Sequence, residues 1–160
     1  MSEPAAPCAP LLVFGWGNPS RGDDALGPAL VELLADHPAV LAGRVELLAD
    51  FLLQVEHALD LQGRRAVLLV DADVAPEGGA RGVRLEPVEP ARDVRHTSHA
   101  LSPSLLLYTV RQLGAVVPPT WLLAIPAQSC ELGAPLGATA RVHLQTAKAL
   151  AAQWLAGHGA

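Results

Sequence analysis

The stretch Gly15–Gly27, GWGNPSRGDDALG, joins a short apolar run to a segment that carries leucines at helical spacing. The run 11–14, LLVF, is typical of a buried strand. Leu26, Leu30 and Leu33 recur as they would along one face of a helix. The quoted stretch is therefore predicted to be a strand-to-helix turn, the first unit of an α/β fold.

The side chains of this turn favour a cation over an anion. Gly15 and Gly17 allow another group to approach the main chain closely. A glycine-rich turn before a helix often binds phosphate, because free amides and the helix dipole attract anions. Here Asp23 and Asp24 stand at the predicted helix start, where one aspartate would be enough for a cap. Two carboxylates would repel an anion, so a metal or peptide site is favoured over a nucleotide-binding loop.

The rest of the chain alternates between predicted strands and helices. The strands are predicted at 10–15, 44–48, 66–70, 83–86 and 120–125, and the helices at 23–36, 52–61, after Ser102-Pro103 and from Thr139. The third strand is apolar on both faces, as in a central parallel strand, whereas 83–86 alternates like an edge strand. We expect one α/β domain over 1–160, with a mostly parallel twisted sheet of about five strands covered by helices on both faces. Residues 1–9 are expected to be a loose leader.

Composition narrows the class of protein. The chain has 160 residues, 51% hydrophobic and 17% charged, and a formal net charge of -5. This charge argues against a broad electrostatic surface for nucleic acid. No apolar run approaches the roughly 18 residues of a membrane span, and the N-terminus lacks the features of a secretion signal, which predicts a cytoplasmic protein without membrane insertion. Cys8 and Cys130 are too few for a disulfide scaffold or a cysteine zinc site.

Polar residues follow three of the predicted strands: Asp23/Asp24, Asp71/Asp73 and Gln128/Glu131. The carboxyl ends of parallel strands meet at one edge of a sheet, where ligands of such folds bind. A buried carboxylate such as that of Asp71 is costly unless it is paired or bound to a metal. Each residue also has a structural interpretation, as a helix cap or as a partner of loop amides. Their convergence favours a functional site.

A histidine can complete this site. His99 stands near the start of the third long helix, with His96 as the alternative, and a neutral imidazole can ligate a metal. A lone loop histidine is also commonly without function. Two carboxylates and one imidazole suit a divalent first-row metal such as nickel or zinc.

Three segments together resemble the [NiFe]-hydrogenase maturation proteases. They are the turn with its Gly-x-Gly-Asn and Asp23-Asp24, the strand end Leu69-Val70-Asp71-Ala72, and Thr97-Ser98-His99-Ala100-Leu101. These endopeptidases remove the C-terminal extension of a hydrogenase large-subunit precursor. The resemblance implies a phosphorylase/hydrolase-like three-layer sandwich. It also implies that Asp24, Asp71 and His99 are both the catalytic residues and the metal ligands.

The resemblance further implies how substrate is recognised. The metal would be the nickel already inserted in the precursor, although another divalent ion such as zinc or cadmium can occupy such a site. The implied substrate-binding residues are Gly17, Asn18, Asp23, Gln54 and Glu56. The last two lie in Asp50–Glu56, DFLLQVE, where many members have a glycine-rich segment. The partner would be the large-subunit precursor, bound by a monomer of this chain.

Other interpretations use the same features. A non-catalytic nickel-sensing chaperone or docking module would bind the large subunit through the same three ligands without shortening it. A peptidyl-tRNA hydrolase shares the Gly17-Asn18-Pro19 turn but needs a basic surface and a histidine soon after it, whereas this chain is acidic. A covered sheet without any catalytic role is the remaining alternative.

Overall fold

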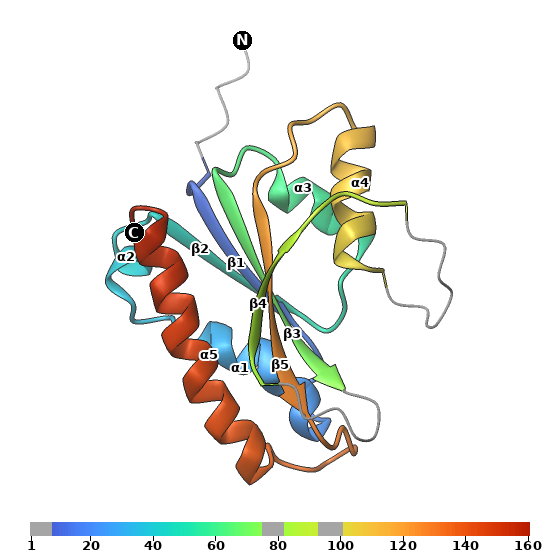
Figure 1. The fold of residues 1–160 in the computed structure, drawn as a ribbon, viewed down its shortest axis with the longest axis vertical. Helices are drawn as coiled ribbons and strands as arrows, with labels where there is room; N and C mark the ends of the chain where they lie inside the picture. Colours follow the sequence, from blue (N-terminus) through green and yellow to red (C-terminus); the bar gives the residue numbers. More distant parts are fainter. Residues whose placement is uncertain (1–7, 75–81, 93–100) are drawn as a thin grey trace.

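The computed structural model describes residues 8–74, 82–92 and 101–160. A five-stranded sheet in the order β2-β1-β3-β5-β4 forms the centre of the protein (Figure 1). Four strands are parallel: β1 (Leu11–Trp16), β2 (Val45–Asp50), β3 (Ala66–Val74) and β5 (Thr120–Ala127). The edge strand β4 (Arg84–Val88) runs antiparallel to β5. The predicted α/β class, the mostly parallel sheet and the place of the edge strand are confirmed.

Helices cover both faces of the sheet (Figure 1). On one face lie α1 (Leu26–Leu33), α2 (Pro38–Leu41) and α5 (Ala138–Gly157), and on the other α3 (Ala58–Leu61) and α4 (Pro103–Gln112). Successive strand residues point to opposite faces, so β1 sends Leu11 and Val13 into one cluster and Leu12 and Phe14 into the other. Because both faces of the sheet are covered, β1 and the first five residues of β3 are buried and apolar.

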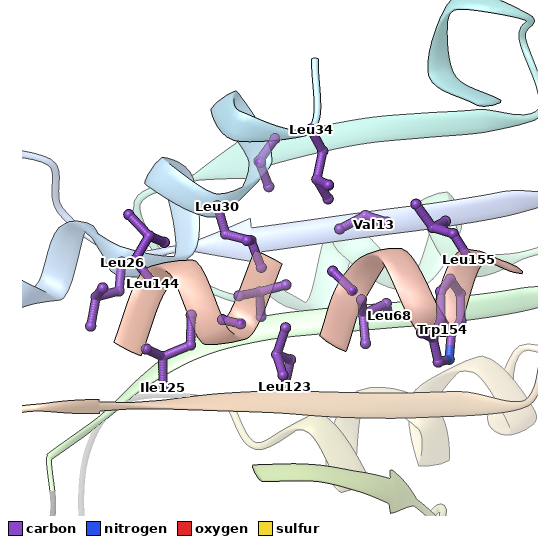
Figure 2. Close-up of a cluster of buried hydrophobic side chains, with 14 of the residues drawn as sticks. Val13, Leu26, Leu30, Leu34, Leu68, Leu123, Ile125, Leu144, Trp154 and Leu155 are labelled. Atoms are coloured by element: carbon purple, nitrogen blue, oxygen red, sulfur yellow. The ribbon is translucent and has the colours of Figure 1, made fainter. Parts of the chain in front are cut away.

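Figure 2 shows the larger cluster, in which leucines of α1 and the C-terminal part of α5 pack on the sheet. α5 has 20 residues and buries one side only, including Ala140, Leu144, Ala147, Ala151 and Trp154. The remaining side of the helix is polar or exposed. Among the helices that the structure describes, none is both long enough and apolar enough to cross a membrane.

The first helix differs from the prediction of 23–36. A 3₁₀ turn, Gly22–Ala25, precedes α1, which ends at Leu33, and the separate helix α2 begins after His37. His37 caps α2 by accepting a hydrogen bond from the N–H of Ala39 through its Nδ1 atom. Asp23 and Asp24 therefore lie in the 3₁₀ turn and outside α1. The helical spacing of Leu26, Leu30 and Leu33 identifies α1 but does not mark its ends, so periodicity missed this division.

The second predicted helix, 52–61, is also shorter than expected. Its helical part is the 3₁₀ turn Val55–His57 followed by α3, and residues 51–54 are irregular. In contrast, β3 is longer than predicted and includes Asp71 and Asp73. α4 begins after Ser102 as predicted, and the Ser102 Oγ atom caps it by accepting a hydrogen bond of 3.1 Å from the N–H of Leu105.

Two glycines allow the start of α1 to lie directly on the sheet. A Cβ atom on Gly15 would stand 2.4 Å from the carbonyl oxygen of Gly27. A Cβ atom on Gly27 would stand 2.5 Å from the Trp16 oxygen and 2.9 Å from the Val70 oxygen. Real side chains do not fit at such distances, so both positions require glycine. This close packing holds the turn after β1 against the carboxyl end of β3.

Candidate active site

The site lies at the carboxyl edge of the sheet, between β1 and β3. From β1 the chain continues to β2 on one side, whereas β3, β5 and β4 extend the sheet on the other. Crevices at such reversals of strand order are where open α/β sheets bind ligands. Gly15 pairs with Val70 at the end of the β1–β3 ladder, so Asp71 is the first residue beyond it. Asp24 follows β1 by one turn.

Asp71 carries the largest electrostatic perturbation that the structure shows. Burial raises the pKa of its carboxyl group, the nearby charge of Asp24 raises it further, and the sum brings it to about 7 despite a hydrogen bond from the Ala72 N–H. Asp73 adds a smaller repulsion. This repulsion means that the carboxylates of Asp24 and Asp71 lie within electrostatic range of each other. A cation between them would relieve the repulsion.

Asp24 is held by the glycine-rich loop. Its Oδ2 atom accepts a hydrogen bond of 2.7 Å from the backbone N–H of Asn18, and its side chain is partly exposed. Gly17, at a φ of 145°, lies so close that a Cβ atom there would meet the Asp24 carbonyl oxygen at 1.9 Å. Gly17 and Asn18, which were predicted to bind substrate, thus contact Asp24 through their backbone atoms. Their contact with substrate stays a prediction.

Asp23 has a different environment from Asp24. It is 2% exposed, and its carboxylate accepts three backbone hydrogen bonds, from Gln128 (2.8 Å), Ser129 (3.3 Å) and Gly137 (2.9 Å). Burial raises the pKa of Asp23, but these hydrogen bonds outweigh burial and hold it below its usual value. The recorded contacts of this carboxylate are all internal, and its predicted role in substrate binding stays untested.

The other polar residues at this edge are also accounted for. The Asp73 Oδ2 atom accepts a hydrogen bond of 2.6 Å from Arg84 Nη2, and Arg84 Nη1 donates to Glu86 at 3.0 Å. Asp73 is therefore part of an ion-pair network that joins β3 to β4. The side chains of Gln128 and Glu131 are exposed.

Sequence reasoning gave no role to Cys130, which the fold brings to the site. Burial raises the pKa of its thiol, and the charges of Asp24 and Asp23 raise it further. The backbone N–H of Asp24 and the charge of Arg21 oppose this shift to a smaller extent. The residue lies in the loop after β5, whose path no local pattern of the sequence indicates. It places a protonated thiol beside Asp24.

The predicted histidine ligands, His99 and its alternative His96, fall outside the described residues. Within 8–74, 82–92 and 101–160, no group of three or more His, Cys, Asp or Glu side chains is arranged to hold a metal ion. A metal site built on Asp24 and Asp71 would therefore need its third ligand from outside these residues.

A small pocket adjoins Asp24 on the β2 side. It has a volume of about 190 Å³ and is lined by Gly17, Pro19, Pro28, Ala49, Asp50 and Phe51. Asp50 ends β2 opposite Trp16. Its carboxylate accepts hydrogen bonds from the Phe51 N–H (2.7 Å) and from His57 Nε2 (3.1 Å). The pocket is therefore an apolar hollow with one carboxylate at its rim.

His57 holds the segment that follows this pocket. Its Nδ1 atom accepts a hydrogen bond of 2.8 Å from the Gln54 N–H, so the ring proton is on Nε2, facing Asp50. The ring is buried against Phe14, with 4.4 Å between the centroids, so this histidine also packs in the core. The side chains of Gln54 and Glu56 are exposed on the same segment. So are four large apolar side chains: Phe51, Leu52, Val55 and Leu59.

Comparison with known proteins agrees with this geometry at the level of the fold. No protein-family model matches the chain, and a search of curated proteins gives no match. Among solved structures, the hydrogenase maturating endopeptidase HybD from Escherichia coli superposes with a TM-score of 0.72 at 21% identity, over 93% of each chain. The chain has the fold of this endopeptidase.

Two further structures support the same conclusion. An endopeptidase from Escherichia coli, solved in solution, has a TM-score of 0.70 at 22% identity over 88% of each chain. The [NiFe] hydrogenase maturation protease HycI from Thermococcus kodakarensis KOD1 has a TM-score of 0.65 at 21% identity over 91% of each chain. At these identities the likeness establishes the hydrogenase maturation protease fold and leaves the chemistry to be argued from the site.

Proposed function

We propose that this protein is an endopeptidase that removes the C-terminal extension of a nickel-loaded [NiFe]-hydrogenase large-subunit precursor. The observation that carries the proposal is the pairing of Asp24 with Asp71 at the strand-order reversal. The shared fold supports it, since solved structures of that fold are named as hydrogenase maturation proteases. The sequence resemblance around the turn supports it independently.

The metal in this proposal is part of the substrate. Two neighbouring carboxylates, one with a pKa raised to about 7, form a site that a divalent cation would neutralise. Asp24 and Asp71, with His99 as the third ligand, would complete the coordination of nickel that is already in the precursor. Zinc or cadmium would occupy the same ligands in the isolated protein, because carboxylate and imidazole bind several divalent metals.

The precursor would dock along the segment after β2. Gln54 and Glu56 offer polar contacts there, and Phe51, Leu52 and Val55 are each more than half exposed. Exposed apolar side chains that gather on one segment are typical of protein–protein contact. The pocket between this segment and the turn after β1 is lined by Gly17, which lies against Asp24. Cleavage would take place in the cytoplasm, the compartment that the sequence predicts.

Two routes to hydrolysis use the same residues. A water molecule on the substrate metal can attack the peptide bond, or a carboxylate can accept a proton from an unbound water. In the protein without a metal ion, Asp71 has the proton affinity that the second role requires, because its pKa is about 7. In both routes the bond is positioned by the metal contact, so a precursor without nickel would not be aligned for cleavage.

The decisive experiment compares two forms of the precursor. The purified protein is mixed with nickel-loaded large-subunit precursor and, separately, with nickel-free precursor, and the intact mass of each product is recorded. Loss of a C-terminal peptide from the loaded sample alone is the expected result. Binding without any loss of mass would point to a chaperone or docking module. Equal cleavage of both samples would support the protease activity and refute the recognition of nickel.

A further inference from the structure

The carboxylate of Asp23 connects two loops that are far apart in the sequence. Its Oδ2 atom accepts from the N–H groups of Gln128 and Ser129, and its Oδ1 atom from that of Gly137. These donors lie 105, 106 and 114 residues further along the chain. Asp23 thus spans the loop between β5 and α5 from its first residue to the residue that precedes α5.

Backbone hydrogen bonds join the same two loops. The Asp23 N–H donates to the Ser129 oxygen at 2.8 Å, and the Gly22 N–H donates to the Ala134 oxygen at 3.0 Å. In the opposite direction, the Gly133 N–H donates to the Ser20 oxygen at 2.7 Å. The turn after β1 and the loop after β5 are therefore one hydrogen-bonded unit, with the Asp23 carboxylate at its buried centre.

Asp24 depends on this unit for its position. It belongs to a 3₁₀ turn of four residues that has no side-chain cap. Its N–H donates to the Arg21 oxygen at 3.0 Å and its carboxylate accepts from the Asn18 N–H at 2.7 Å, both within the turn after β1, and Cys130 of the loop after β5 also contacts its N–H. Such a short turn has few internal hydrogen bonds to hold it. The neighbouring Asp23 connects it to the rest of the protein. Any displacement of Asp23 would be transmitted through a single peptide unit to Asp24.

We propose that Asp23 is a positioning residue, which sets the placement of Asp24 relative to Asp71 by anchoring the loop 128–137 beneath the turn. This inference rests on the proposed function and gives the two aspartates of the pair different tasks. Asp24 faces the substrate metal, and Asp23 holds Asp24 in place. The alternative is that Asp23 contributes only to overall stability.

The Asp23→Asn variant separates these two possibilities. Both carboxylate oxygens of Asp23 accept N–H groups, so an amide of the same shape must turn its NH₂ group toward at least one donor. The loop contact is then lost on one side while the volume of the side chain is kept. The matched control is Thr120→Val, which removes a buried hydrogen bond of 2.8 Å to the Pro118 oxygen at the opposite end of β5.

Two measurements are made at a temperature where all variants are folded. The first is kcat and KM for cleavage of the nickel-loaded precursor, and the second is the dissociation constant of the isolated protein for Cd²⁺. We expect Asp23→Asn to lower kcat by about tenfold and to weaken Cd²⁺ binding, whereas Thr120→Val changes neither. If Asp23→Asn loses stability but keeps the wild-type kcat and Cd²⁺ affinity, the positioning role is refuted.

A second variant tests the contact from the other loop. Gly137 has a φ of -67°, which proline adopts, so Gly137→Pro keeps the backbone conformation of this residue, removes the N–H donor and puts the Cδ atom of the ring where the hydrogen bond to Asp23 Oδ1 was. It should lower kcat and Cd²⁺ affinity in the same direction as Asp23→Asn and at least as strongly, because the ring displaces the carboxylate, and it decides the question if Asp23→Asn does not fold. Unchanged values in a folded Gly137→Pro protein would then overturn the inference. If the wild-type protein does not shorten the precursor, the proposed function fails, and the Cd²⁺ measurement still tests the positioning of Asp24.

Discussion

The two loops around Asp23 and the end of β3 at Asp71 shift the pKa of a carboxyl group in opposite directions. Both groups lie at the same edge of the sheet, and burial raises the pKa of each. Around Asp23, three backbone N–H groups more than offset burial, and the pKa falls below its usual value. At Asp71 the neighbours are Asp24 and Asp73, and the pKa rises to about 7.

This difference shows which carboxylate is available for chemistry. A carboxylate surrounded by N–H donors is stable as an anion, and its hydrogen bonds define the local structure. A carboxylate beside another carboxylate gains a partner only when a proton or a cation arrives. Strongly perturbed carboxyl groups in a crevice are candidates for function for this reason. In the proposed function, Asp23 therefore belongs to the framework and Asp71 to the reacting site.

The largest expected effect comes from Asp71→Asn. The variant should not cleave the precursor, yet it should be more stable than the wild type at pH 8. Because the folded pKa of Asp71 is raised from 3.8 to about 7, its ionisation destabilises the folded state progressively as the pH rises through this range. Each unit by which the folded pKa exceeds the unfolded pKa lowers the free energy of unfolding by about 1.4 kcal/mol once the group is fully ionised.

Urea unfolding of both proteins at pH 4 and pH 8 measures this effect. The stability advantage of the variant should be larger at pH 8 than at pH 4, since asparagine does not ionise. If the wild type is as stable as Asp71→Asn at pH 8, the pKa of Asp71 is not raised as described. If the variant retains full cleavage, Asp71 is not needed for the reaction.

The second effect is the loss of stability in Asp23→Asn, with the opposite dependence on pH. The folded pKa of Asp23 is lowered, so its contribution to stability is present above the usual carboxyl pKa and is lost as the pH falls through the folded value. We expect the variant to be less stable than the wild type by about 2 kcal/mol near pH 7. The difference should shrink in acid. The control is Asp36→Asn at an exposed aspartate, whose stability should differ little from that of the wild type. Equal losses of stability in both variants would contradict the stabilising role of the Asp23 carboxylate.

The smallest effect concerns the thiol of Cys130. The charges of Asp24 and Asp23 help to raise its pKa, so Asp24→Asn should lower that pKa and speed alkylation by iodoacetamide at pH 8 by about twofold or more. The measurement is made in a Cys8→Ser background, because Cys8 is exposed and would dominate the signal. An unchanged rate would mean that Asp24 is further from the loop after β5 than the structure places it.

Much of the fold could be predicted from local patterns. A few adjacent residues determine each of the following features: the apolar strands, the turn after β1, the edge strand β4 and the Ser102 cap. Helix lengths were less predictable. The segments 23–36 and 52–61 each divide into a 3₁₀ turn and a shorter helix, because tertiary packing ends a helix that periodicity alone would continue.

The candidate site shows the same limit. The sequence by itself determined that Asp23, Asp24 and Asp71 would stand at the carboxyl edge of a parallel sheet, because strand direction and strand ends follow from local hydrophobic patterns. Only the tertiary structure decided that Asp23 is bound inside while Asp24 stays open beside Asp71 and Cys130. The physical reason is the origin of the hydrogen-bond donors. The donors belong to a loop more than a hundred residues further along the chain. No pattern within the turn predicts which of the two adjacent carboxylates will accept their hydrogen bonds.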